Sequence, residues 1–174
     1  YCGVNPQLLI CVIDPYTLKP WGTRYWNGVT MLNPDHNFGN SNDNGECRPR
    51  PELHFAFPQN DPGYMAAAEN MILNEIPDSF YYLIYTSRYA NYPGWDGANP
   101  NMYNVFAGLG SDSIYAGRPN VPFIVFGRKG DPNSLIEVYG QDIEDLIHFE
   151  DTLWGYDYTG GEMSTVIGPA EEWD

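Results

Sequence analysis

Glycine and basic residues come together in residues 109–131, "LGSDSIYAGRPNVPFIVFGRKGD". A glycine-rich turn that binds phosphate joins a strand to the N-terminus of a helix, where backbone N–H groups face the anion. Here Gly108 and Gly110 follow an expected helix, and "GRKGDPN" joins two expected strands. The glycine and lysine spacing of a P-loop is also absent. We therefore interpret "GRKGDPN" as a β-turn in which Gly130 takes a left-handed conformation.

Cysteine and histidine could support nucleophilic catalysis only where a thiol lies beside a positioned histidine. Cys11 lies in the apolar run "LLICVI", which predicts a buried core side chain. Cys2 and Cys47 could pair with each other, or stay free. His36 and Cys47 share one long loop, and no G-x-S-x-G motif occurs. The sequence therefore predicts no catalytic residue, and we expect that the chain is not itself an enzyme.

The asparagines of "NSNDNG" resemble the first half of a calcium-binding loop, because Asn40, Asn42 and Asn44 alternate before a glycine. The acidic residue that should close such a loop is missing, since Pro51 stands at the twelfth position. Neutral amides alone make poor calcium ligands. We interpret residues 33–51 as a hydrated surface loop with a weak calcium candidate, and we expect no other metal and no cofactor.

Aromatic residues are the strongest binding feature of the sequence, which holds 14 tyrosines and 5 tryptophans. Several lie in or beside expected loops rather than in apolar runs. Exposed Trp and Tyr near an arginine suit sugar stacking or a protein hot spot. Packing against neighbouring domains is an equal alternative. The residues concerned are Trp21, Tyr25, Trp26, Tyr92, Trp95 and Tyr103.

The charge of the chain excludes two classes of partner. Its 174 residues carry 8 basic and 23 acidic side chains, a formal net charge of −15. Nucleic acids and anionic membrane surfaces bind basic proteins, so we expect neither. No apolar run reaches the roughly 20 residues of a membrane span, so we expect no membrane insertion. The chain begins without methionine and ends abruptly, which suggests a piece of a larger protein.

Buried strands and amphipathic helices alternate along the sequence. Residues 60–78 predict a helix, because Asp61 can cap it, Pro62 suits its first turn, and an apolar stripe recurs at helical spacing. A second helix is expected at 99–110, capped by Asn99, whereas 90–100 reads as a loop. Strands are expected at 7–14, 52–57, 79–89, 121–127 and 134–140, with a hairpin at 19–32. This order predicts a mixed α/β (α+β) fold with a sheet that is covered on both faces.

Three stretches resemble the interleukin-like EMT inducer (ILEI) and PANDER family over about residues 7–140. They are "LLICVIDPYTLKPWGTRYW", "LNEIPDSFYYLIYTSRY" and "LGSDSIYAGRPNVPFIVFGRKG". The resemblance implies a compact β-β-α fold of two sheets with flanking helices, in a secreted and non-enzymatic module. We accordingly place one domain at residues 1–140. Residues 141–174 then form a linker and the start of a following β-rich domain.

A related stem domain of a glycosyltransferase binds a terminal sugar with two arginines and an acid. The resemblance places those arginines at Arg24 and Arg118, while Tyr89 stands near the position of the acid. With the aromatic residues beside them, the candidate contacts to a ligand or partner are Arg24, Trp26, Tyr89, Trp95 and Arg118.

The long insertion at residues 33–52, "IPDSFYYLIYT" and the tail "GEMSTVIGPAEEW" resemble a module within large PorU-like proteins of the bacterial type IX secretion system. Those proteins are related to the gingipain cysteine peptidases. The resemblance implies a non-catalytic accessory or spacer module of a secreted or cell-surface multidomain protein. Its partners would be neighbouring domains, a glycan or a surface protein. Alternatively, the chain is part of a hydrolase whose catalytic residues lie in another domain.

Overall fold

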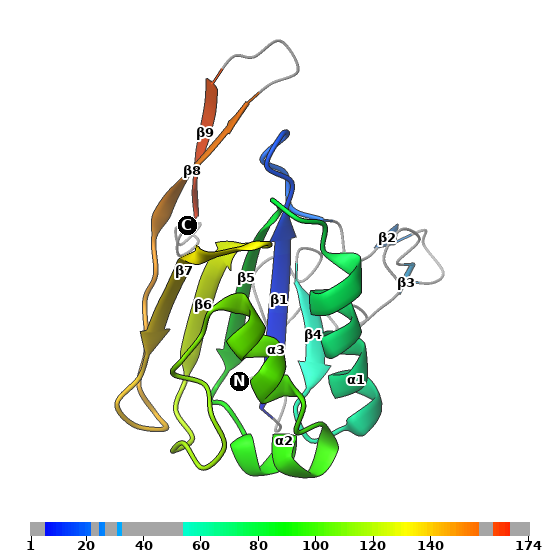
Figure 1. The fold of residues 1–174 in the computed structure, drawn as a ribbon, viewed down its shortest axis with the longest axis vertical. Helices are drawn as coiled ribbons and strands as arrows, with labels where there is room; N and C mark the ends of the chain where they lie inside the picture. Colours follow the sequence, from blue (N-terminus) through cyan, green and yellow to red (C-terminus); the bar gives the residue numbers. More distant parts are fainter. Residues whose placement is uncertain (1–5, 22–24, 27–30, 33–53, 157–161, 168–174) are drawn as a thin grey trace.

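A five-stranded antiparallel sheet forms the centre of the molecule, with strands in the order β4-β1-β5-β6-β7. The computed structural model describes residues 6–21, 25–26, 31–32, 54–156 and 162–167 (Figure 1). The sheet strands are β1 (Gln7–Ile13), β4 (Phe55–Pro58), β5 (Tyr81–Ser87), β6 (Phe123–Arg128) and β7 (Asp131–Tyr139). Two antiparallel pairs accompany it, β2 (Tyr25–Trp26) with β3 (Met31–Leu32) and β8 (Asp151–Tyr156) with β9 (Glu162–Ile167). A mixed α+β fold class is thus confirmed.

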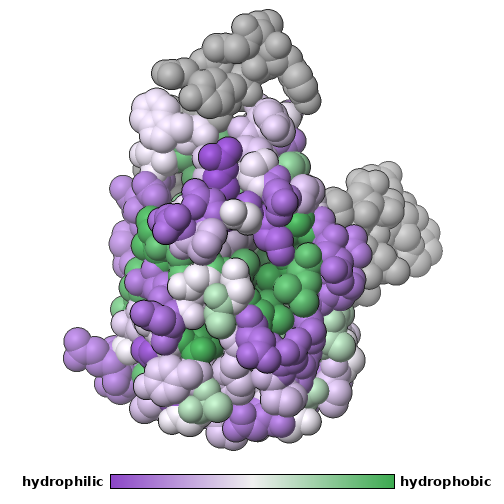
Figure 2. Space-filling model, in the orientation of Figure 1, coloured by the Kyte–Doolittle hydropathy of each residue, from purple (hydrophilic) through white to green (hydrophobic). Residues whose placement is uncertain are grey.

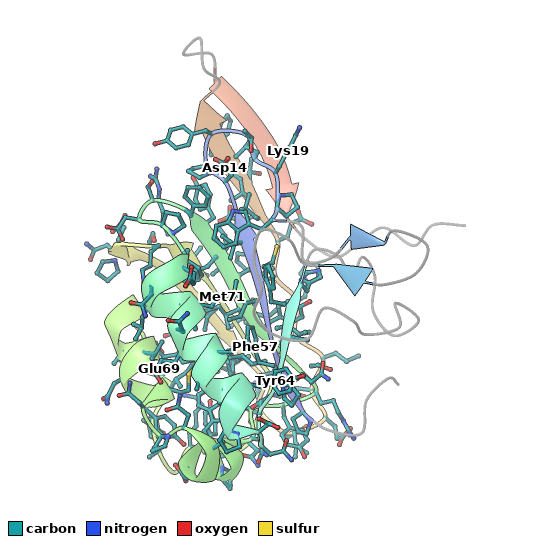
Figure 3. All side chains as sticks on the ribbon, turned by 90° about the vertical axis from the view of Figure 1, so that its right-hand side faces the viewer. Asp14, Lys19, Phe57, Tyr64, Glu69 and Met71 are labelled. Atoms are coloured by element: carbon teal, nitrogen blue, oxygen red, sulfur yellow. The ribbon has the colours of Figure 1, made fainter. Side chains whose placement is uncertain are left out.

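The helices cover one face of this sheet. They are α1 (Pro62–Asn70), the π-helical turn η2 (Met71–Glu75), α2 (Tyr92–Ala98) and α3 (Met102–Leu109). Alternate residues of β1 point toward them, and Leu8, Ile10 and Val12 are all fully buried in the main core. Phe57 and Met71 also lie in this core, between helix and sheet (Figure 3). Figure 2 shows a mostly hydrophilic surface on this side, with some apolar atoms exposed toward its middle.

The opposite face of the sheet contacts the C-terminal part of the chain. Cys11 and Phe126 form a second cluster with Leu153, and Phe149 packs against Phe126 at 5.3 Å between ring centroids. The Tyr81 hydroxyl also donates a hydrogen bond to the backbone carbonyl of residue 154 at 3.0 Å. The expected cover on both faces is therefore present in part, with helices on one side and this segment on the other. Part of the predicted linker packs against the sheet, and the predicted boundary at residue 140 stays a prediction.

Helix α1 begins where its sequence predicts. The Asp61 carboxylate accepts hydrogen bonds from the backbone N–H groups of Gly63 and Tyr64, at 2.8 and 3.1 Å. The apolar stripe is buried in the core and comprises Met65, Ala68, Ile72 and Ile76. The helix widens in its last turn, where the Ile76 N–H donates to the Met71 carbonyl at 3.0 Å. This π turn was not predicted, and it leaves the next carbonyls without partners inside the helix.

The segment predicted as a loop at residues 90–100 contains helix α2, so that prediction is wrong. Asn91 caps the helix by accepting from the Gly94 N–H at 3.3 Å, and Pro93 occupies its first turn. The seven-residue helix contains two glycines, which are poor helix formers. Its stability comes from packing, because Tyr92 and Trp95 are buried with 1% and 0% of their surface exposed.

Helix α3 starts later than predicted. The side-chain oxygen of Asn99 accepts from the Asn101 N–H at 3.2 Å, while its amide donates to Glu69 on α1 at 2.6 Å. These contacts hold Asn99 in a turn, and Asn101 occupies the N-cap position instead, without a capping hydrogen bond from its side chain. Its predicted end is confirmed, because Gly110 adopts a left-handed φ of 106°. The predicted left-handed Gly130 is also confirmed, with a φ of 82°.

None of the helices among the described residues has the length and apolar character that crossing a membrane requires.

Two glycines at the end of α3 provide a matched test of this geometry. A Cβ at Gly110 would lie 2.8 Å from the Pro132 carbonyl oxygen in a left-handed conformation, whereas a Cβ at Gly108 meets nothing within 4 Å. We expect Gly110→Ala to lower the free energy of unfolding by about 1–3 kcal/mol. Gly108→Ala should raise it by about 0.5–1 kcal/mol, because alanine favours the helix. Urea unfolding followed by tryptophan fluorescence measures both, and equal effects would contradict the assigned geometry.

Candidate binding site around Arg118

Several of the sequence-predicted site residues cannot be placed in a common site. Arg24 and the calcium candidates Asn40, Asn42 and Asn44 lie outside the described residues. Trp26 is described as part of the short strand β2. In the parts of the chain that the structure describes, no three His, Cys, Asp or Glu side chains are grouped so that they could hold a metal ion.

Trp95 does not offer its ring to a ligand, so its predicted role as a contact residue is wrong. Its ring is fully buried and stacks on Phe106 at 5.6 Å between ring centroids. Its indole N–H donates to the side-chain oxygen of Gln59 at 2.8 Å. The error follows from reading residues 90–100 as a loop, because helix α2 turns this ring into the core.

Tyr89 is half-buried, and its backbone carbonyl accepts a hydrogen bond from the Gln59 amide at 3.0 Å. The contact described for Tyr89 therefore connects it with Gln59 and not with Arg118.

Arg118 lies in the loop between α3 and β6, and aromatic rings surround its guanidinium group. The guanidinium carbon lies 4.0 Å from the centroid of the Tyr139 ring and 5.9 Å from that of Tyr115. One terminal nitrogen donates to the backbone carbonyl of Ser113. Attraction between the cation and the Tyr139 ring holds the guanidinium plane in place. The bond to Ser113 is the one hydrogen bond of the Arg118 side chain among the described residues, and a guanidinium group has five N–H donors.

Glu137 supplies a carboxylate beside Arg118, and sequence reasoning missed it. Its Oε1 atom accepts from the Tyr139 hydroxyl at 2.5 Å and from the Ser111 hydroxyl. Burial raises the pKa of Tyr139, and its hydrogen bond to Glu137 raises that pKa further. Glu137 lies on β7 between Leu135 and Tyr139, which both pack against the main core. The alternation along this strand could have indicated Glu137, because residues two apart in a strand share a face and Glu137 therefore lies on the same face as Leu135 and Tyr139.

Tyr92 brings a third polar group close to these residues. Its hydroxyl is buried and has no hydrogen-bond partner among the described residues. Burial raises the pKa of Tyr92, the charge of Arg118 lowers it, and Glu137 raises it. Both charges thus act on one tyrosine, which supports their placement in a common site. We name this site the Arg118 cluster, and it comprises Ser111, Tyr115, Arg118, Glu137 and Tyr139.

The Arg118 cluster presents groups that suit recognition of hydroxyl groups. Arg118 provides N–H donors, and the second carboxylate oxygen of Glu137 forms no hydrogen bond in the described structure. Tyr115 adds an aromatic surface, since 53% of it is exposed. The cluster contains no cysteine or histidine. Cys11 lies elsewhere in the core, and burial raises the pKa of its thiol to about 12, so it stays protonated.

Comparison with protein-family models, curated proteins and solved structures gives no match for this chain. The resemblance to the ILEI and PANDER family and the type IX secretion context therefore stay predictions. Function is inferred below from the geometry of the Arg118 cluster.

Four tyrosines near the core are expected to make the protein sensitive to alkali. Burial is the main cause that raises the pKa of Tyr82, Tyr92, Tyr103 and Tyr139. Each therefore holds its proton more tightly in the folded than in the unfolded chain. Above pH 10, approximately the pKa of an unfolded tyrosine, the unfolded state loses protons first, and the free energy of unfolding falls as pH rises.

A spectrophotometric titration of tyrosinate measures this effect. Part of the absorbance of the 14 tyrosines should appear only together with unfolding, as followed by circular dichroism. The urea-unfolded protein is the control, in which all tyrosines titrate together. A folded protein whose tyrosines all ionise near pH 10 would contradict the burial described above.

Proposed function

We propose that this chain is a non-catalytic accessory module of a secreted or cell-surface multidomain bacterial protein, and that it binds a glycan through the Arg118 cluster. One observation carries the proposal. The Arg118 guanidinium carbon lies 4.0 Å from the centroid of the Tyr139 ring, the Tyr139 hydroxyl donates to the Glu137 carboxylate, and the centroid of the exposed Tyr115 ring lies 5.9 Å from the same carbon. A sugar presents hydroxyl groups that both donate and accept, together with an apolar C–H face that stacks on aromatic rings. The cluster offers a partner for each of these groups.

The neighbouring carboxylate favours a neutral sugar over an acidic one. Glu137 accepts from Tyr139, whose ring carries the Arg118 guanidinium, so a negative ligand would meet a negative group in the same site. The whole chain also carries a formal net charge of −15. Neutral hydroxyl groups avoid this repulsion and still form charge-assisted hydrogen bonds with both side chains.

A partner protein is the second candidate ligand, because tyrosine and arginine are frequent hot-spot residues at protein interfaces. The exposed Tyr115 ring and the half-buried Arg118 side chain fit that pattern. In the related hypothesis of a hydrolase, the catalytic residues lie in another domain and this chain contributes the binding surface. The ILEI and PANDER fold type, with its two sheets, belongs to the same proposal.

Arg118→Ala tests the proposal on a glycan array, and Arg128→Ala is a matched control. Arg128 also lies over a tyrosine, 5.5 Å from the Tyr81 ring centroid, but at the opposite end of strand β6. We expect binding to weaken at least tenfold in Arg118→Ala, because hydrogen bonds to a charged group contribute about 1.5–3 kcal/mol. Arg128→Ala should bind as the unchanged protein does. The glycan proposal fails if no glycan binds, or if both variants lose the same affinity.

The Glu137→Gln variant tests whether the ligand is neutral or acidic. The substitution keeps the shape of the side chain but removes its negative charge, which lies close to Arg118 through Tyr139. For a neutral sugar we expect weaker binding, because the glutamine accepts less strongly from the sugar hydroxyl groups. Titration calorimetry with the best glycan of the array measures the change. Tighter binding in Glu137→Gln would show instead that the ligand is acidic.

A further inference from the structure

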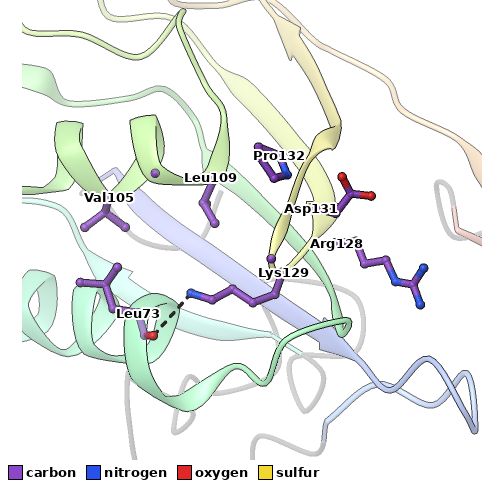
Figure 4. A pocket seen from close by; sticks show the side chains of 9 residues that line it. Leu73, Val105, Leu109, Arg128, Lys129, Asp131 and Pro132 are labelled. Atoms are coloured by element: carbon purple, nitrogen blue, oxygen red, sulfur yellow. Dashed lines mark hydrogen bonds between the residues drawn. The ribbon is translucent and has the colours of Figure 1, made fainter.

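A small cavity lies at the other end of the sheet from the Arg118 cluster. It opens between the π turn η2, helix α3 and the turn from β6 to β7, and its volume is about 230 Å³ (Figure 4). Its walls are mainly apolar and come from Leu73, Val105, Leu109 and Pro132. The turn beside it contributes Lys129 and Asp131, and α3 contributes Gly108. The cavity is smaller than the roughly 300–1,000 Å³ of sites for drug-sized ligands, so it fits a ligand of few atoms.

Two cationic residues, Arg128 and Lys129, line this cavity, and Lys129 is the one whose charged group points toward η2. Its ammonium donates to the backbone carbonyl of Ile72 and to that of Leu73, the latter at 3.5 Å. Both carbonyls lie in η2, where the wider helical turn leaves them without partners inside the helix. An ammonium group has three N–H donors, so one remains for a further acceptor.

No carboxylate neutralises this ammonium among the described residues. Asp78 raises the pKa of Lys129 from a distance, but burial lowers it by more, so the net shift is downward. The neighbouring Arg128 points its guanidinium group away from the cavity (Figure 4), and it donates to the Ser79 carbonyl instead. Lys129 is therefore a partly desolvated cation with apolar walls beside it and no opposite charge in contact.

We propose that this cavity binds a small carboxylate with a short apolar body. The carboxylate accepts the free N–H of Lys129, and the body packs against Leu73, Val105, Leu109 and Pro132. A phosphate fits less well, because Asp131 at the rim repels a double negative charge and apolar walls offer it no donors. An uncharged ligand would leave the ammonium without an opposite charge.

This site is distinct from the proposed glycan site, because Lys129 precedes β7 whereas Glu137 and Tyr139 lie toward the other end of that strand. The two linings approach each other only at the end of α3, where Leu109 lines the cavity and Ser111 belongs to the Arg118 cluster. Failure of the glycan test thus leaves the carboxylate proposal standing, and the reverse also holds.

The lysine content of the chain makes a direct test possible, because Lys19 and Lys129 are its only lysines. Lys19 is exposed and lies far from the helices in Figure 3, so it serves as an internal control. In protein labelled with carbon-13 at the lysine ε position, nuclear magnetic resonance follows both side chains during titration with butyrate. We expect the Lys129 signal to shift, its pKa to rise, and the amide signals of Gly108 and Gly130 to move. The signal of Lys19 should shift with butyrate only as much as it shifts with an equal concentration of chloride.

Two pairs of variants separate binding from folding. Lys129→Met removes the charge and keeps the aliphatic chain, and Lys19→Met is its control. We expect Lys129→Met to weaken butyrate binding about tenfold or more. Because Lys129 also caps the η2 carbonyls, this variant is expected to be less stable, so a second one is needed. Gly108→Leu fills the rim of the cavity, and Gly97→Leu on α2 is its control, since a Cβ meets nothing within 4 Å at either glycine. We expect Gly108→Leu to abolish binding and Gly97→Leu to retain it.

Four outcomes would overturn the proposal. The first is the absence of butyrate-induced shifts at Lys129, Gly108 and Gly130 in the folded protein. The second is equal binding of butyramide, the uncharged counterpart, which would remove the role of the ammonium. The third is a folded Lys129→Met or Gly108→Leu variant that binds butyrate as the unchanged protein does. Inorganic phosphate is titrated alongside, and tighter binding of phosphate than of butyrate would reject the ligand class.

Discussion

One buried side-chain amide determines how the end of the sheet next to the Arg118 cluster is built. Gln59 follows β4 and is fully buried, so each of its polar atoms needs a partner. Its oxygen accepts from the Trp95 indole at 2.8 Å and from the Asn91 backbone N–H at 2.7 Å, and its nitrogen donates to the Tyr89 carbonyl. These bonds connect the end of β4, the segment after β5 and helix α2. If the amide lost these partners, two groups would stay buried and unpaired, which costs more than the bonds themselves contribute.

The loop that carries Arg118 depends on this arrangement. The Ala90 N–H donates to the Val121 carbonyl at 3.0 Å, and the Tyr92 N–H donates to the side-chain oxygen of Asn120 at 3.2 Å. Both hydrogen bonds connect the segment before β6 with residues 89–92, which are themselves hydrogen-bonded to Gln59. Arg118 then reaches Tyr139 at the end of β7, so a rigid scaffold presents its guanidinium group. A site that is held in this way loses little conformational entropy on binding.

The sequence predicted best where local pattern and burial agree. Strand β1 is an unbroken apolar run buried on both faces, and Asp61 with Pro62 marks the start of α1. Helix α2 could not be predicted, because its residues favour a turn locally and its stability comes from the packing of Trp95 and from Gln59, which is distant in sequence. The same packing explains why Trp95 is not a surface residue. The alternation along β7 could have indicated Glu137, whereas the contact between Arg118 and the Tyr139 ring could not be predicted without the fold.

The ligand classes that we propose for Arg118 and Lys129 differ because the immediate surroundings of the two cations differ, although the chain as a whole is strongly acidic. Charges farther apart than about 8 Å are largely screened at physiological salt, so the net charge of −15 affects each site less than its nearest neighbours do. Arg118 has the Glu137 carboxylate within its cluster, so neutral hydroxyl groups suit it. Lys129 has carbonyl dipoles and apolar walls, so a single negative charge suits it. The two proposals therefore depend on different nearest neighbours, a carboxylate beside Tyr139 for Arg118 and carbonyl groups of η2 for Lys129. Opposite ends of one small sheet thus offer two dissimilar chemical environments, and each proposal is tested by its own ligand.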